Sequence, residues 1–293
     1  TSGSETLSVS GNIFLGQTES PLMVRPFISK MTKSELMAIM TGGFATVSGG
    51  VLAIYVSWLS NIPGIAGHLL AASVMSAPAA LVIAKIIYPE IEESSTMGDL
   101  NIEIKQSHTN GMEALSTGAT DGLKLAANIA AMLLVFLAFI AMGNYILDTF
   151  GNLIQINDWI NNNTVYETLS IELILGYLLA PLMWLIGVAK EDITLMGQLL
   201  GIKIVASEFI GYIQLAELKQ ASNLIHLNYQ KSIIIATYML CGFANFASIG
   251  IQIGGIGALA PKRRTDLSKL GILALIAGTL ACLFTAVIVG MIL

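Results

Sequence analysis

Glu19 lies in a short polar segment between two apolar stretches. Gly16, Gln17 and Thr18 precede it, and apolar residues flank the segment at 13–15 and 21–24. Each flank is too short for the roughly 20 apolar residues of a membrane crossing. The pattern predicts a re-entrant hairpin, which reaches membrane depth only where protein or a wet cavity surrounds it. A carboxylate there is costly and predicts a functional site; the alternative is a surface turn between amphipathic helices.

Glu208 has similar surroundings in the second half of the chain. The apolar stretches at 195–207 and 209–218 meet at this carboxylate, and each is again too short to cross a bilayer. We therefore predict a second re-entrant hairpin with Glu208 at its tip. Lys203 lies in the first arm of that hairpin, and one interpretation is that it pairs with Glu208.

A four-residue motif occurs twice, once after each predicted hairpin. Gly43-Phe44-Ala45-Thr46 recurs almost letter for letter as Gly242-Phe243-Ala244-Asn245. Both copies lie midway along glycine-rich apolar spans. Glycine costs about 0.8–1 kcal/mol per helical position relative to Ala, so both spans are predicted to unwind there; close helix packing is the alternative. Paired broken helices in two inverted halves indicate a secondary transporter.

The composition is that of a membrane protein. Of 293 residues, 55% are hydrophobic and 11% are charged, whereas about a quarter of the residues of a soluble domain are charged. Lys and Arg are scattered along the chain, which argues against a nucleic-acid partner. We expect a multi-pass protein of the plasma or inner membrane, embedded in the lipid bilayer.

The basic residues set the expected orientation. Those at 25, 30 and 33 and the cluster at 262–264 share the inner side if 168–189 lies along the outer surface instead of crossing. The predicted fold is an all-α integral membrane protein of inverted repeats, with two re-entrant hairpins and two glycine-broken helices. Its predicted parts are a first hairpin (1–31), a broken span and a following span (32–88), a cytoplasmic loop (89–121), a scaffold span (122–150), an interfacial helix (168–189), a second hairpin (190–222), and a broken span with a final span (231–293).

The polar residues of these four elements form one chemical set. Neutral hydrogen-bonding groups predominate, and two carboxylates accompany them. Such a set suits a neutral, polyhydroxylated solute together with a cation, because carboxylates repel an anionic substrate. Its members are Gln17, Thr18, Glu19 and Glu208 at the tips, and Thr46, Ser48, Asn245 and Ser248 in the broken spans.

Several of these segments resemble motifs of one family. Residues 12–22 are similar to the first-hairpin motif of the concentrative nucleoside transporters. Gly201-Ile202-Lys203, with Ser207-Glu208-Phe209-Ile210-Gly211-Tyr212 after it, resembles that family's signature G-x-K-x3-N-E-F-V-A-Y, and 241–249 and 259–264 also match. The resemblance covers essentially the whole chain. Because the chain opens at Thr1 inside a motif, we expect a C-terminal portion that starts in the first hairpin, without the family's N-terminal helices.

The resemblance implies roles for individual residues. The first-hairpin residues would hold a nucleobase, with Glu19 assisting through water and Val51 packed on the base. The residues of the second half would hold the ribose hydroxyls, with Phe243 alongside. The implied nucleoside-binding residues are Gln17, Thr18, Glu19, Val51, Glu208, Phe243, Asn245 and Ser248. The implied sodium ligands are the side chains of Asn12 and Thr46 and the carbonyls of Leu15 and Val47.

The resemblance also implies an activity, an assembly and some alternatives. We expect a sodium-coupled nucleoside symporter, with a substrate such as uridine, in a homotrimer whose hairpins and broken helices move against a scaffold. Ser207 replaces the signature Asn, and Ile210-Gly211 replaces Val-Ala. A proton-coupled symporter or a transporter of another small polar solute are the alternatives. An intramembrane enzyme with Glu19 and Glu208 as an acid–base pair lacks an activated nucleophile in the sequence, so we expect no enzyme.

Overall fold

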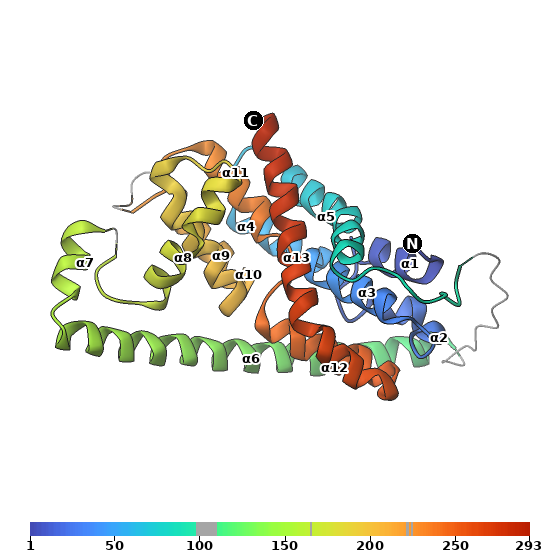
Figure 1. Ribbon diagram of the computed structural model, residues 1–293. Coiled ribbons are helices and arrows are strands. Elements are labelled where there is room, and N and C mark those ends of the chain that lie inside the picture. Colours follow the sequence, from blue (N-terminus) through green and yellow to red (C-terminus); the bar gives the residue numbers. More distant parts are fainter. Residues whose placement is uncertain (98–109, 165, 221–222, 224) are drawn as a thin grey trace.

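The computed structural model describes residues 1–97, 110–164, 166–220, 223 and 225–293. All regular elements in these ranges are helices, which confirms the predicted all-α class (Figure 1). Three helical segments in the described part are long and apolar enough to cross a membrane: Lys33–Trp58, Ile65–Ile87 and Pro261–Ile292.

The N-terminal segment is a short helix followed by an irregular return. Helix α1 spans Gly3–Gly11, and the return consists of the 3-10 helix η1 (Ser20–Val24) and α2 (Arg25–Ile28). The second arm of the predicted first hairpin is therefore not one continuous helix. Pro21 and Pro26 explain the interruption, because proline lacks an N–H donor and disfavours helical geometry in the residue before it.

The first broken span is interrupted three residues after its glycine pair. Helix α3 (Lys33–Ala45) starts at Thr32, whose hydroxyl accepts from Glu35 N at 3.0 Å, and α4 spans Gly49–Trp58. Residues 46–48 lie between them outside any helix. Gly42 stays helical and packs closely, since a Cβ there would lie 2.8 Å from the Val9 side chain. Both interpretations of the glycine-rich stretch therefore apply, to different residues.

Helix α5 (Ile65–Ile87) leads to α6, which spans Gly111–Leu153. Helix α6 starts inside the stretch expected to be a loop to 121, because Asn110 caps it: the Asn110 Oδ1 accepts from Glu113 N at 2.8 Å. It runs as a long rod along one side of the molecule (Figure 1). The Asn144 amide of α6 donates to both carboxylate oxygens of Glu172 at 2.9 and 3.1 Å. This contact joins α6 to α8 (Ile171–Leu185). Helix α7 (Asn157–Asn163) lies between α6 and α8 in the sequence.

The second half repeats the pattern of a helix pair and a broken span. The pair is α9 (Ile193–Val205), preceded by the 3-10 turn η2 (Lys190–Asp192), and α10 (Glu208–Leu218). The broken span is α11 (Gln230–Leu240) and α12 (Phe246–Leu259). The 3-10 turn η3 (Pro261–Arg263) and α13 (Arg264–Ile292) complete the chain. The interruption covers 241–245 and ends there because the Asn245 side chain caps α12.

The two interruptions cross each other. Phe243 N donates to the Thr46 carbonyl at 3.2 Å. A main-chain hydrogen bond therefore joins the second break to the first. Gly242 has a φ of 113°, and a Cβ on it would lie 2.6 Å from the Phe44 carbonyl oxygen. Helix α13 packs against α3, α5, α11 and α12. It approaches closely at Gly278, where a Cβ would lie 2.3 Å from the Phe44 Cβ.

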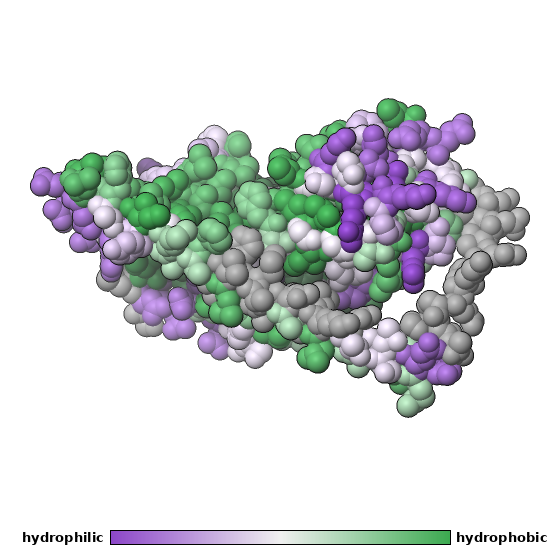
Figure 2. Space-filling view, turned by 90° about the horizontal axis from the view of Figure 1, so that it is seen from below, coloured by the Kyte–Doolittle hydropathy of each residue, from purple (hydrophilic) through white to green (hydrophobic). Residues whose placement is uncertain are grey.

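Apolar side chains also cover much of the outer surface. Figure 2 shows broad apolar areas on the face seen from below, with hydrophilic side chains in one large group and in smaller groups at both ends. Ile272, Ile276 and Phe284 of α13 are 61%, 47% and 53% exposed. Contiguous apolar surface of this kind marks contact with lipid or protein.

We predict that Gly242→Ala destabilises the protein by about 1–3 kcal/mol, the usual cost of an unfavourable backbone conformation. The added methyl group would meet two carbonyl oxygens at a φ that L-residues rarely adopt. The measurement is the thermal unfolding of the detergent-purified protein. Gly250→Ala is the matched control, because a Cβ there meets nothing within 4 Å; equal melting temperatures for the two variants would contradict the prediction.

Candidate functional site

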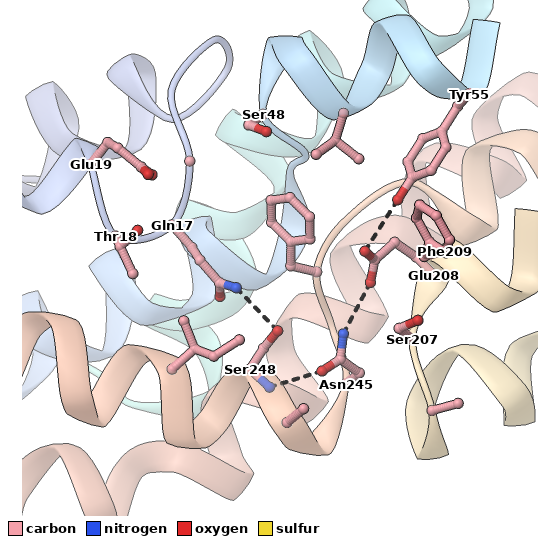
Figure 3. Close-up of a pocket in the computed structure, with 16 residues that line it drawn as sticks. Gln17, Thr18, Glu19, Ser48, Tyr55, Ser207, Glu208, Phe209, Asn245 and Ser248 are labelled. Carbon is pink, nitrogen blue, oxygen red and sulfur yellow. Dashed lines mark hydrogen bonds between the residues drawn. The ribbon is translucent and has the colours of Figure 1, made fainter. Parts of the chain in front are cut away.

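A cavity of about 290 Å³ opens where the two predicted hairpin tips meet the two breaks (Figure 3). Its walls come from both halves of the chain. It brings together all eight residues that the sequence predicts for substrate binding. The lining residues are Gly16, Gln17, Thr18, Glu19, Ser48, Val51, Tyr55, Ala206, Ser207, Glu208, Phe209, Phe243, Asn245, Ala247, Ser248 and Ile251.

Glu208 is a buried carboxylate of the cavity that neighbouring side chains hold by hydrogen bonds. It is the first residue of α10 and 5% exposed. The Tyr55 hydroxyl donates to its Oε1 at 3.2 Å, and the Asn245 amide donates to its Oε2 at 3.0 Å (Figure 3). A carboxylate at a helix N-terminus is also stabilised by the helix dipole. With one donor on each oxygen, the carboxylate keeps acceptor capacity for further hydroxyl groups.

Asn245 and Ser248 link the start of α12 to the cavity. The Asn245 Oδ1 accepts from Ser248 N at 2.8 Å, so the same side chain caps α12 and contacts Glu208. The Ser248 hydroxyl accepts from the Gln17 Nε2 at 3.1 Å. A continuous chain of hydrogen bonds therefore joins the first hairpin tip to Glu208.

The Gln17 amide is oriented by a residue outside the predicted set. Gln252 Nε2 donates to the Gln17 Oε1 at 3.0 Å and to the Met40 carbonyl at 3.1 Å. Because Gln17 Oε1 accepts from Gln252, its NH2 group faces Ser248 and the cavity. Gln252 is fully buried, which makes it a positioning group rather than a cavity wall.

The other two tip residues are less enclosed. The Thr18 side chain lies against α12, since a Cβ on Gly255 would be 2.8 Å from its Cγ2. Glu19 is half-buried and lines the cavity beside Gly16. Within the described residues, no hydrogen bond or ion pair joins the Glu19 carboxylate to another side chain. It is therefore free to act on a water molecule or a ligand.

Lys203 does not pair with Glu208 as one interpretation of the sequence suggested. Its side chain is fully buried, and its Nζ donates to the carbonyls of Met239 and Cys241 at 2.9 and 3.3 Å. Among the described residues no ion pair joins it to a carboxylate. Lys203 therefore caps the carboxyl end of α11, where a positive charge is favourable.

The residues predicted for sodium lie beside this cavity, where the first hairpin turn contacts the first break. The Phe14 carbonyl accepts from Gly49 N at 3.0 Å, which brings the segment with Leu15 against the start of α4. Asn12 is 1% exposed, and neither atom of its side-chain amide has a hydrogen-bond partner. An unpaired buried amide is costly, so an oxygen-seeking cation or a water molecule fits there.

Thr46 and Val47 form the other side of this region. Both are buried, and the Thr46 hydroxyl donates to the Gly42 carbonyl at 3.1 Å. Its oxygen keeps its lone pairs for a cation, since the proton is already engaged. Interrupted helices expose carbonyl groups of the kind that hold Na+ in transporters.

Sequence reasoning missed two polar side chains that hold the hydrogen bonds of the site. Tyr55 and Gln252 each lie four residues after a predicted residue, Val51 and Ser248 respectively. Residues four apart share a helix face. That spacing is the signal that could have found both of them once α4 and α12 were recognised as helices.

Comparisons with known proteins agree on one family. A family model described as Na+ dependent nucleoside transporter C-terminus matches residues 68–290. The chain is 42% identical to sodium/nucleoside cotransporter 1 of Rattus norvegicus over 99% of this chain and 44% of that protein. It is 44% identical to an uncharacterized transporter of Haemophilus influenzae over 99% of this chain and 66% of that protein. The chain therefore spans less than half the length of its rat relative.

Solved structures lead to the same family. The structure of CNTnw in an inward-facing substrate-bound state matches with 40% identity and a TM-score of 0.84, over 99% of this chain and 65% of that one. A CNTnw variant in an outward-facing state matches with 39% identity and a TM-score of 0.85, over 99% and 66%. The chain belongs to the Na+-dependent nucleoside transporters, which are multi-pass membrane proteins and not enzymes, and it corresponds to their C-terminal part.

Proposed function

We propose that this chain forms the substrate and ion sites of a sodium-coupled nucleoside symporter. The observation that carries the proposal is the cavity between the hairpin tips and the breaks, in which neutral hydrogen-bonding groups surround the fixed Glu208 carboxylate. Its volume of about 290 Å³ lies at the small end of the usual range of ligand pockets, about 300–1,000 Å³. It suits a small polar solute such as uridine.

The two ends of the cavity suit the two parts of a nucleoside. Glu208 accepts hydrogen bonds, and Asn245 and Ser248 lie next to it, which matches the vicinal hydroxyls of a ribose. At the other end, the NH2 group of Gln17 faces the cavity and offers a donor to a nucleobase edge, with Thr18 beside it.

Apolar groups and a second carboxylate complete this proposed pose. Val51 and Phe243 line the cavity and supply packing surface for the base and the sugar. Glu19, whose carboxylate has no partner among the described residues, would assist through a water molecule.

The proposed sodium ligands are the side chains of Asn12 and Thr46 and the carbonyls of Leu15 and Val47. The unpaired buried amide of Asn12 supports this set. All four supply oxygen, the ligand that hard cations prefer. A sodium ion there would join the first hairpin turn to the start of α4, next to the substrate, so the two ligands would favour the same arrangement of the protein.

The remaining parts of the proposal concern movement and assembly. The hairpins at 1–31 and 190–222 and the two broken helices would move as a transport domain against a scaffold that includes α6, within a homotrimer. The helix at 168–189 would lie along the membrane surface, and 89–121 would face the cytoplasm. The described start of α6 at Gly111 places part of that region in a helix.

We predict that Glu208→Gln lowers uridine affinity by about 100-fold, because hydrogen bonds to a charged group contribute about 1.5–3 kcal/mol each. The measurement is equilibrium binding of radiolabelled uridine at saturating sodium. Glu217→Gln is the matched control, since Glu217 lies exposed on the same helix. Unchanged uridine affinity in the Glu208 variant would refute the ribose assignment.

Asn12→Ala is expected to raise the sodium concentration for half-maximal uridine binding roughly tenfold or more, because one contact to a charged group contributes about 1.5–3 kcal/mol. Uridine affinity at saturating sodium should change much less. Asn162→Ala, at an exposed position of α7, controls for the loss of an asparagine. Equal losses of sodium and uridine affinity would argue against a direct sodium ligand.

The decisive test of the function is radiolabelled uridine uptake into proteoliposomes that carry the full-length transporter, under a sodium gradient, a proton gradient or neither. We expect accumulation with sodium alone. Uptake with protons alone would keep the nucleoside site and make Glu19 and Glu208 the candidate proton carriers. No uptake under either gradient would refute nucleoside transport and leave another small polar solute as the substrate.

A further inference from the structure

Tyr55 joins the two halves of the site. Its side chain is fully buried, and its hydroxyl donates to the Glu208 Oε1 at 3.2 Å. Its ring stacks on that of Tyr212, with 4.2 Å between the centroids. Tyr55 belongs to α4 in the first broken span, whereas Glu208 and Tyr212 belong to α10 in the second half. The contact therefore depends on how α4 sits against α10.

The other end of α4 lies at the proposed sodium site. Gly49, its first residue, donates its N–H to the Phe14 carbonyl at 3.0 Å, and residues 46–48 of the break come directly before it. From Gly49 to Tyr55 the helix is uninterrupted and rises about 9 Å. A shift at the start of α4 therefore moves the Tyr55 hydroxyl as well.

An aromatic cluster holds this end of α4 on α10. Trp58 and Phe209 contact each other edge to face at 4.8 Å, and the Lys219 Nζ donates to the Trp58 carbonyl at 3.1 Å. At 3.2 Å the bond from Tyr55 to Glu208 is longer than the usual 2.5–3.0 Å of an O–H···O bond. A small movement of α4 toward Glu208 would therefore strengthen it.

We propose that Tyr55 is the positioning residue through which sodium binding at the start of α4 prepares Glu208 for the ribose hydroxyls. The inference rests on the function proposed above and adds the residue that couples ion to substrate. Sodium orders residues 46–48 and fixes the start of α4. The helix carries that constraint to Tyr55, whose hydroxyl holds the Oε1 of Glu208 and sets the direction of the carboxylate.

The hydrogen-bond chain through Gln17, Ser248 and Asn245 also reaches Glu208, on its Oε2. That chain consists of groups that face the substrate. Tyr55 differs because it lies on the helix that starts at the proposed sodium site. Because coupling is reciprocal, a change at Tyr55 must alter the effect of uridine on sodium affinity by the same factor.

The experiment compares the wild-type protein with the Tyr55→Phe variant, which lacks only the Tyr55 hydroxyl. Uridine dissociation constants are measured in sodium and in choline, and sodium dependence is measured with and without uridine. We expect the sodium-induced gain in uridine affinity to fall about fivefold or more, within the range of typical coupling factors. The variant should therefore lose more uridine affinity in sodium than in choline.

Tyr238→Phe is the matched control. It removes a hydroxyl that contacts the His68 ring at 3.3 Å, between α11 and α5 and outside the cavity. It should leave the sodium-induced gain unchanged. Melting temperatures of both variants report on folding independently of coupling.

Two results would overturn the inference alone. One is a Tyr55→Phe variant that loses uridine affinity equally in sodium and in choline, which would make Tyr55 a simple binding contact. The other is a variant that keeps the full sodium-induced gain. A wild-type protein whose uridine affinity does not depend on sodium would instead overturn the proposed sodium coupling itself, and the inference with it.

Discussion

The crossing of two interrupted helices is the constraint on which the rest of the structure depends. A helix that stops inside an apolar environment leaves N–H and C=O groups without partners, and each such group is costly there. Here main-chain groups at the breaks find hydrogen-bond partners in the other break and in neighbouring side chains. The Phe243 N–H donates to the Thr46 carbonyl, and the Lys203 Nζ donates to two carbonyls at the end of α11. The close approach of Gly242 and Gly278 to α3 makes this arrangement possible.

The polar groups of the cavity also result from helix ends that need hydrogen-bond partners. Three helices, α4, α10 and α12, begin at its wall, so their N–H groups and positive dipole ends face it. The residues that begin them carry the polar side chains: Ser48 precedes α4, Glu208 opens α10, and Asn245 caps α12. The side chains of Ser207 and Asn245 both cap a helix and line the cavity.

Buried carboxylates anchor the outer ends of both helix pairs. Glu35, at the start of α3, accepts from the Ser2 hydroxyl before α1 at 2.5 Å. Asp192, before α9, accepts from the main-chain N–H groups of Asn228 and Tyr229 before α11 at 2.8 and 3.2 Å. In each half, a carboxylate thus ties the beginning of the pair to the beginning of the broken span. The opposite ends of the pairs, the tips, lie at the cavity.

The sequence by itself determined the helical class, the approximate breaks and most of the polar residues, because these follow from local properties. Glycine repeats, short apolar arms and polar tips can be read without knowing what lies opposite. The sequence analysis did not predict that α6 begins at Gly111, inside the expected loop, where Asn110 caps it. It also did not predict the interruption of the return after the first tip, where Pro21 and Pro26 lie.

Tertiary structure alone decided the partners. Lys203 caps α11 and does not meet Glu208, Gln252 orients Gln17, and Tyr55 reaches Glu208 across the two halves. Those contacts join residues that are 36 to 235 positions apart in the sequence. No local pattern encodes them, since the angle and depth at which two breaks meet depend on the packing of every helix around them.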